Sequence, residues 1–198
     1  MKETMVKKPE LDLELILQPE TPLERTIIRN KTFRKGLLWG VPRYGHPEGE
    51  IYKHIRDVFD NIDCLEISHL ERERLRLIAL VHDTFKHQEL KNKPRDWTKH
   101  HGVLARHFLA AYTADETVLK ITEIHDEAYY IWRLKHLYHR EQESRQRLLL
   151  LLEQLGENLQ LFYLFFKCDT CTGDKIQSPL KWFEQHIPGI TIVHLRNN

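Results

Sequence analysis

The stretch LIALVHDTFKHQ, residues 77–88, ends an apolar run with two ionisable side chains. Residues 77–81 are all apolar, and His82 and Asp83 follow directly, with Lys86 three residues later. Burying an imidazole or a carboxylate without a partner costs free energy. The stretch therefore predicts a buried helix whose end delivers two polar groups to a shared partner.

The composition favours one globular domain and excludes several classes of protein. The chain has 198 residues, enough for a real core, and a formal net charge of +1, which gives no reason to expect a nucleic-acid or membrane partner. Its most apolar stretch, 148–166, is interrupted by Glu153 and Glu157, so it predicts a core helix and not a membrane span. The N-terminus lacks the apolar core of a signal peptide, and three cysteines fit a reducing compartment. We expect a cytoplasmic protein.

The apolar periodicity predicts an all-α fold. Thr21-Pro22 opens the first helix with a cap and a proline at its first turn. Helices are expected over 22–31, 47–62, 70–82, 98–113, 115–139, 143–168 and 178–186. Residues 1–20 are expected to form a flexible arm, and 190–195 alternate like a short strand. The predicted organisation is an arm and short helix over 1–35, a helical bundle over 36–186 and a tail over 187–198.

The chain has 13 histidines, and four of them lie on apolar stripes of the predicted helices. One inward histidine is usually a hydrogen-bonded core residue. Several on separate helices are better explained by a metal centre, which uses neutral imidazoles and ionised carboxylates together. The residues that would meet in this way are His54, His82, Asp83, His101, His125 and Asp169.

The order of these six residues resembles that of the HD superfamily, an all-α family of mainly metal-dependent phosphohydrolases. The likeness is best at LIALVHDTFK and continues in HIRDV, HHGVLARHFL, ITEIHDEAYYIW and FYLFFKCDT. In HHGVLARHFL the better register uses His101, with His100 as the competitor. The likeness covers roughly residues 36–175, and the expected fold is a single-domain HD helical bundle.

The resemblance implies one or two divalent transition-metal ions, from among Mn, Fe, Ni, Co and Zn. His54, His82, Asp83 and Asp169 match the core site of the family. His101 and His125 match the extra ligands of members with two metals, and Asp83 matches the bridge.

The leading hypothesis is a metal-dependent phosphohydrolase that acts on a small phosphorylated metabolite, most simply a nucleotide, through metal-activated water. Asp83 would be catalytic and orient the attacking hydroxide. Lys86 would pair with the phosphate, and Arg43 is a weaker candidate for that role. A run of cations, Lys91, Lys93, Arg95 and Lys99, could steer an anion toward the site. Asp126 is expected to be a surface carboxylate.

Two alternatives remain open. A di-iron HD-type oxygenase would use the same ligand types, because imidazole and carboxylate also bind iron. A non-catalytic metal-binding interaction module would use the 1–35 arm as its contact surface. Nucleic-acid processing is disfavoured, since the chain lacks a basic stripe with interleaved aromatic residues.

Overall fold

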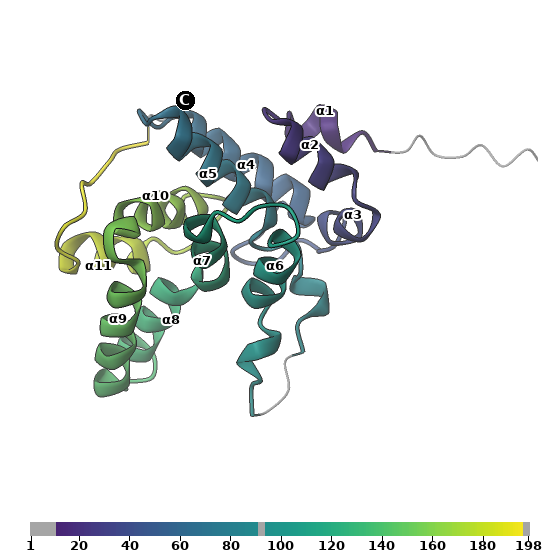
Figure 1. Cartoon of the computed structure of the whole chain (residues 1–198). Helices are drawn as coiled ribbons and strands as arrows, with labels where there is room; N and C mark the ends of the chain where they lie inside the picture. The colour runs from purple at the N-terminus through teal and green to yellow at the C-terminus, as the bar shows by residue number, and fades with distance from the viewer. Residues whose placement is uncertain (1–10, 91–93, 196–198) are drawn as a thin grey trace, which may run out of the picture.

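The computed structural model describes residues 11–90 and 94–195, and within these ranges every regular element is a helix (Figure 1). The only other pairing there is an isolated antiparallel bridge between Arg43 and His46. The all-α expectation is therefore confirmed. The α-helices are α1 Leu13–Leu17, α2 Pro22–Arg29, α3 Lys31–Leu37, α4 Ile51–Asp63, α5 His69–Val81, α6 His101–Leu109, α7 Glu116–Ile124, α8 Glu127–His136, α9 Glu141–Leu155, α10 Leu159–Thr170 and α11 Ser178–His186, with 3-10 turns at Lys86–Gln88, Trp97–Lys99 and Gly156–Asn158.

Helix α5, which carries the apolar run, is the centre of the fold. Ser68 caps its first turn reciprocally with Glu71, and its residues from Leu75 to Val81 are all buried. It packs against α4, α7 and α10, so three other helices surround its last turn. Because the last turns of α5 are buried on all sides, the residues that follow them, His82 and Asp83, are also buried in the interior.

The N-terminal region is more ordered than predicted. Residues 1–10 lie outside the described part of the chain, but Leu13 and Leu17 of α1 are fully buried, so the expected flexible arm is wrong for residues 11–20. Asp12 caps α1 by accepting hydrogen bonds from two backbone amides of its first turn. The apolar face of this short helix, with Leu13 and Leu17, packs on α4.

Helix α3 approaches the turn after α5 very closely. A Cβ added at Gly36 would lie 2.0 Å from the carbonyl oxygen of Thr84. Only glycine permits this contact, which packs the N-terminal helices directly behind the His82-Asp83 turn.

The helix predicted over 22–31 is α2, while α3 was not predicted: Asn30 ends α2, and its side chain caps α3 by accepting from the Thr32 and Phe33 amides. Two other predicted helices are interrupted in the structure. The helix expected over 143–168 breaks at Gly156, whose φ of 48° leaves the helical region. The helix expected over 115–139 breaks after Ile124, at His125 and Asp126.

The strand expected over 190–195 is wrong. Its backbone pairs with side chains of α10 and not with a neighbouring strand. The Thr191 amide donates to Gln160 Oε1 at 2.8 Å, the Gln160 amide donates back to the Thr191 carbonyl at 3.0 Å, and the Val193 amide donates to the Tyr163 hydroxyl at 3.3 Å. These bonds satisfy an extended segment without a sheet.

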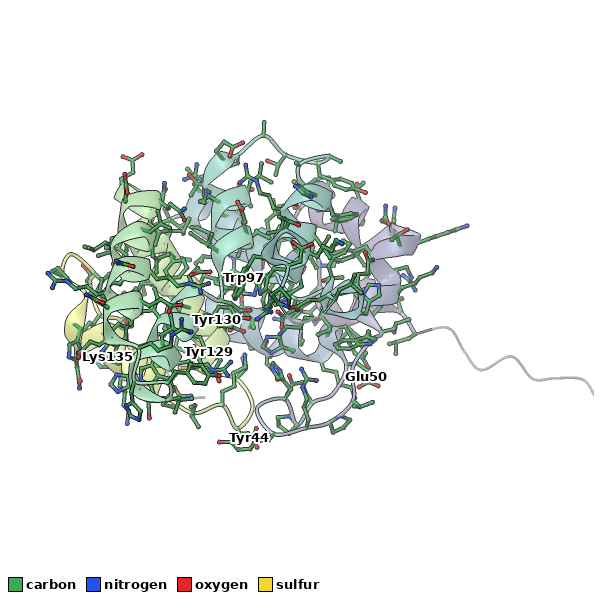
Figure 2. The ribbon with its side chains drawn as sticks, turned by 90° about the horizontal axis from the view of Figure 1, so that it is seen from below. Tyr44, Glu50, Trp97, Tyr129, Tyr130 and Lys135 are labelled. Atoms are coloured by element: carbon green, nitrogen blue, oxygen red, sulfur yellow. The ribbon has the colours of Figure 1, made fainter. Side chains whose placement is uncertain are left out.

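The buried apolar residues form one continuous cluster from Leu13 to Ile187, so the described chain is a single domain. The domain boundaries at 35/36 and 186/187 stay predictions. Within the described ranges, no helix combines the length and the apolar character that crossing a membrane requires. On the underside of the bundle, Trp97, Tyr130, Tyr129 and Tyr44 follow one another across the face shown in Figure 2.

Candidate metal centre

Helix ends bring most of the predicted ligands together. His82 is the C-cap of α5 and Asp83 follows it in the turn, His101 is the first residue of α6, and His125 is the C-cap of α7. His54 lies within α4, and Asp169 is the penultimate residue of α10. All six predicted residues therefore converge on one point of the interior, from five helices.

The first cluster consists of His54, His82 and Asp169. The His54 Nε2 atom lies 2.9 Å from Asp169 Oδ1, and the His82 Nε2 atom lies 3.6 Å from the same oxygen. Both histidines are almost completely buried. The facing atoms are close enough to share one ion, because first-row metals bind imidazole nitrogen and carboxylate oxygen at about 2.0–2.2 Å each.

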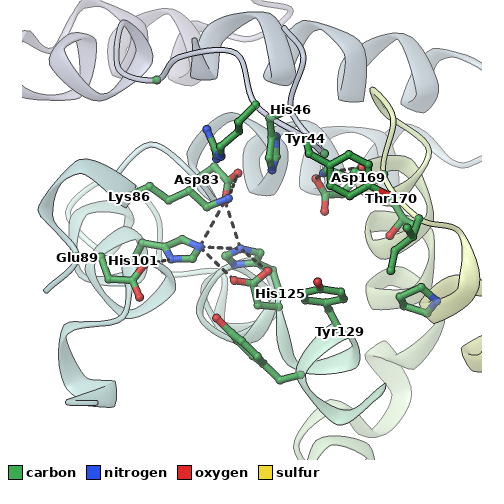
Figure 3. Close-up of a pocket in the computed structure, with 18 of the residues that line it drawn as sticks. Tyr44, His46, Asp83, Lys86, Glu89, His101, His125, Tyr129, Asp169 and Thr170 are labelled. Carbon is green, nitrogen blue, oxygen red and sulfur yellow. Dashed lines mark hydrogen bonds and ion pairs between the residues drawn. The ribbon is translucent and has the colours of Figure 1, made fainter. Parts of the chain in front are cut away.

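The second cluster consists of Asp83, His101 and His125. The Nε2 atoms of the two histidines are 3.2 Å apart, and they lie 3.4 Å and 3.5 Å from Asp83 Oδ1 (Figure 3). The other oxygen, Asp83 Oδ2, lies 3.5 Å from His82 Nε2 and 3.9 Å from His54 Nε2. One carboxylate thus turns one oxygen toward each cluster.

The ring orientation of each histidine is fixed through its Nδ1 atom. The His82 Nδ1–H donates to the Ala79 carbonyl and the His125 Nδ1–H to the Thr122 carbonyl, both at 2.9 Å. These bonds also satisfy carbonyls that the ends of α5 and α7 leave free. His101 Nδ1 bonds to Glu89 at 2.8 Å, and His54 Nδ1 lies 3.4 Å from Glu48 and Thr172 oxygens. This is the arrangement that presents Nε2 to a metal.

Two buried atoms at the meeting point lack the partners that buried polar atoms need. His82 Nε2 and Asp83 Oδ1 are buried and have no hydrogen-bond partner among the described residues. Leaving such atoms unsatisfied costs free energy, and a divalent ion beside each of them would remove that cost. The residues present therefore fit one or two metal ions, as the sequence predicted.

The two aspartates of the clusters, Asp83 and Asp169, are ionised at neutral pH. Burial raises the pKa of Asp83, but His82, Lys86 and the neighbouring histidines outweigh burial and hold that pKa well below its usual range. The pKa of Asp169 is lowered in the same way against burial, chiefly by Lys175 and His54. Ionised carboxylates are the form that binds metal.

The two histidine environments differ in charge. Burial and the nearby Lys175 lower the pKa of His54 to about 4, so its ring is neutral at pH 7. Burial opposes charge on His101 too, but the carboxylates of Asp126, Asp83 and Glu89 outweigh it and raise the pKa of His101 to about 10. In the metal-free protein, His101 therefore carries a proton that a metal would have to displace.

His101, and not His100, faces Asp83. The His100 ring caps α6 by accepting from the Gly102 amide at 3.1 Å, and its Nε2 atom contacts the Tyr130 hydroxyl at 3.3 Å. His101 therefore lies with Asp83 and His125, while His100 caps the start of α6 and groups with Glu89 and His101. The assignment of His101 as the ligand stays a prediction.

The predicted substrate-binding cations are placed unequally. Lys86 Nζ lies 2.5 Å from Asp83 Oδ2, at the centre of the site, whereas Arg43 is exposed at the mouth. Lys91 and Lys93 lie outside the described residues. Arg95 is paired with Glu89, and Lys99 Nζ lies 3.5 Å from Asp96, so neither of these is a free steering charge.

The expectation that Asp126 is a surface carboxylate is wrong. Its Oδ2 atom lies 3.3 Å from His101 Nε2 and its Oδ1 atom 3.7 Å from His125 Nε2. The break between α7 and α8 turns the side chain inward, whereas a continuous helix would have pointed it away from His125. Its position next to His125 in the sequence was the signal for this role.

Sequence reasoning missed three further charged residues at the site. Glu89 accepts from His101, Glu48 Oε1 lies 3.4 Å from His54 Nδ1, and Lys175 donates to Asp169 Oδ1 at 2.8 Å. All three lie in loops, where no helical periodicity indicates which side chains turn inward.

The two clusters open into a pocket of about 1190 Å³. Its floor includes Asp83, His101, His125 and Asp169, and its walls come from segment 38–46, from α8 and from residues 175–179. The site is therefore reachable by a small molecule, as a catalytic centre requires.

No family model, curated protein or solved structure matches this chain. The structure itself shows an all-helical domain with buried His and Asp clusters that could hold metal ions.

Proposed function

We propose that this protein is a metal-dependent phosphohydrolase of the HD type, acting on a small phosphorylated metabolite. The observation that carries the proposal is Asp83, whose two oxygens face two different His-containing clusters. A carboxylate in that position suits two ions that share one ligand, and paired ions are widely used to transfer phosphoryl groups.

The chain's own residues would divide the work between binding and orientation. His54, His82 and Asp169 would hold one ion, His101 and His125 the other, and Asp83 would contribute to both. When bound, divalent transition metals lower the pKa of water and supply hydroxide near neutral pH. Asp83 lies between the clusters and Asp126 lies beside the second, where they would orient the attacking oxygen and accept its proton.

Lys86 and Lys175 would receive the phosphate. Each ammonium group neutralises a ligand carboxylate, Lys86 on Asp83 and Lys175 on Asp169, and each lines the pocket. An entering phosphate can share these donors without any large movement of the chain. Arg43 lies farther out in the pocket lining and would attract the anionic substrate.

The test is phosphate release by protein that has been stripped of metal and reloaded in turn with Mn, Fe, Co, Ni or Zn. We expect turnover of phosphate monoesters or nucleotides with at least one metal, and its loss in Asp83→Asn. Glu153→Gln, a change of an exposed carboxylate on α9, is the matched control and should keep full activity.

Two results would overturn the proposal. Oxygen consumption with the iron-loaded protein and an organic substrate, without phosphate release, would establish the oxygenase alternative. Stoichiometric metal binding with no turnover of any phosphorylated compound would favour a non-catalytic metal-binding module.

A further inference from the structure

The pocket is much larger than the chemistry at its floor requires. Its volume of about 1190 Å³ exceeds the usual range for small-molecule sites, about 300–1000 Å³, and corresponds to roughly 40 waters at ~30 Å³ each. Two ions and a phosphate group fill only a small part of it. Most of the pocket is therefore available to the rest of the substrate.

The outer part of the pocket is apolar and aromatic. Segment 38–46 contributes Leu38, Trp39 and Val41, all of which are exposed, and Ile176 lies exposed in another wall. Large apolar side chains left exposed around one opening are typical of a binding surface. The residues that complete this apolar wall are Tyr44, Tyr129, Phe166 and Pro179.

Several polar side chains of the pocket already have partners within the protein: His46 contacts Glu48, Tyr130 contacts His100 and Arg133 donates to Tyr138. Among its described lining residues there is no Asn, Gln or Ser. The carboxylates are already engaged: Glu89 with Arg95 and His101, and Asp126 with His100 and His101. Hydroxyl groups remain on Tyr44, Tyr129 and Thr170, but ribose hydroxyls placed against the apolar side chains of Trp39, Val41 and Ile176 would lack partners, which is costly.

We propose that the organic part of the substrate is an apolar, ring-bearing group, so that the substrate class is an arylalkyl phosphate and not a nucleoside or sugar phosphate. This inference rests on the proposed phosphohydrolase function and narrows its substrate. The phosphate occupies the floor beside Lys86 and Lys175, and the ring lies against Trp39 and Tyr129. Burial of the ring supplies affinity that the polar floor cannot give.

The experiment compares three monoesters of primary alcohols, so that the leaving groups are similar: 2-(1-naphthyl)ethyl phosphate, ethyl phosphate and adenosine 5′-monophosphate. With the metal-loaded protein we expect kcat/KM for the naphthylethyl ester to exceed that for the other two by about 10–100-fold, the size expected for burying an aromatic group. Tyr129→Ala and Trp39→Ala should each lower the naphthylethyl-to-ethyl ratio about tenfold. Leu150→Ala, an exposed apolar change on α9 outside the pocket, should leave the ratio unchanged.

The outcomes separate the two proposals. A preference for adenosine monophosphate over the naphthylethyl ester would overturn this inference and leave the phosphohydrolase standing. If none of the three esters is hydrolysed, equilibrium binding of 2-(1-naphthyl)ethylphosphonate and ethylphosphonate to the metal-loaded protein still decides the inference. Equal affinity for the two phosphonates would overturn it, and tighter binding of the naphthyl compound that is weakened in Tyr129→Ala would support it.

Discussion

The two clusters on either side of Asp83 are built differently. In the first, His54 and Asp169 lie within helices, and the pKa of His54 is lowered to about 4, so its ring is neutral without a metal. In the second, His101 and His125 lie at helix ends, His101 is held by the loop residue Glu89, and its pKa is raised to about 10.

Because of this difference, the two clusters should bind metal with a different dependence on pH. The first cluster presents a neutral His54 on regular backbone, so a metal there displaces no proton from that ring. In the second cluster, His101 keeps its proton until a metal replaces it. The orientation of its ring depends on Glu89, which lies in a loop. We expect the first side to bind more readily and the second to be the more sensitive to pH and to loop changes.

The largest expected effect comes from removing one histidine from each side. His82→Ala should leave a protein that binds one metal through the second cluster, and His125→Ala one that binds through the first. Either change should reduce phosphate release at least about 10³-fold, because a metal contributes several kcal/mol and each ~1.4 kcal/mol is tenfold in rate. Elemental analysis measures the stoichiometry. Retention of two metals in either variant would show that the clusters are wrongly assigned.

The pH dependence of metal affinity should differ between these two variants. His101 must lose a proton, so below its pKa of about 10 the affinity of His82→Ala should rise with pH, by about tenfold per unit. His54 is already neutral above about pH 5, so this ring adds no slope from pH 6 to 8, and the affinity of His125→Ala should rise less steeply with pH. Competition with a metal-binding dye at several pH values measures both. Equal slopes would remove the distinction between the clusters.

Glu89→Gln tests the loop contact alone. The change keeps the shape of the side chain but removes the charge that faces His101 Nδ1, at 2.8 Å in the structure. Loss of such a partner typically lowers metal affinity 10–100-fold, and here only the second metal should be affected. Titration of metal into stripped protein checks this result, with Glu153→Gln as the control. Equal weakening of both binding steps would mean that Glu89 acts on the whole fold.

Gly102→Ala should give the smallest effect. A Cβ at this position would lie 2.4 Å from the Glu123 carbonyl oxygen, so α6 must shift away from α7, where His125 is located. We expect a loss of about 1–3 kcal/mol in the free energy of unfolding and a weaker second metal, with the first unchanged. Urea unfolding and metal titration measure the two effects. Unchanged stability would mean that the α6–α7 contact is looser than the structure shows.

The sequence predicted the ligands better than the path of the chain between them. Apolar periodicity placed His54, His82, His101 and Asp169 inward, because the face of a helix is set by residues only three or four positions apart. Periodicity could not predict that the helix ends at His125, between α7 and α8. There the imidazole donates to the Thr122 carbonyl at the end of α7, a bond that forms only when the helix stops.

Residues that act from loops were beyond sequence reasoning. Glu89 lies 12 positions from His101, and Lys175 reaches Asp169 through a turn after α10. Nothing in the local pattern distinguishes them from solvent-exposed charges. The strand prediction for 190–195 was wrong for a related reason. The backbone amides of Thr191 and Val193 donate to side chains of α10 and not to a neighbouring strand.

Metal content by elemental analysis, on untagged wild-type protein and Asp83→Ala side by side, tests the central claim most directly. The account predicts about two transition-metal ions per chain in the wild type and at most one, weakly held, in the variant, because Asp83 turns an oxygen toward each cluster. A wild-type protein that binds no metal after reloading with manganese, iron, cobalt, nickel or zinc would contradict the account.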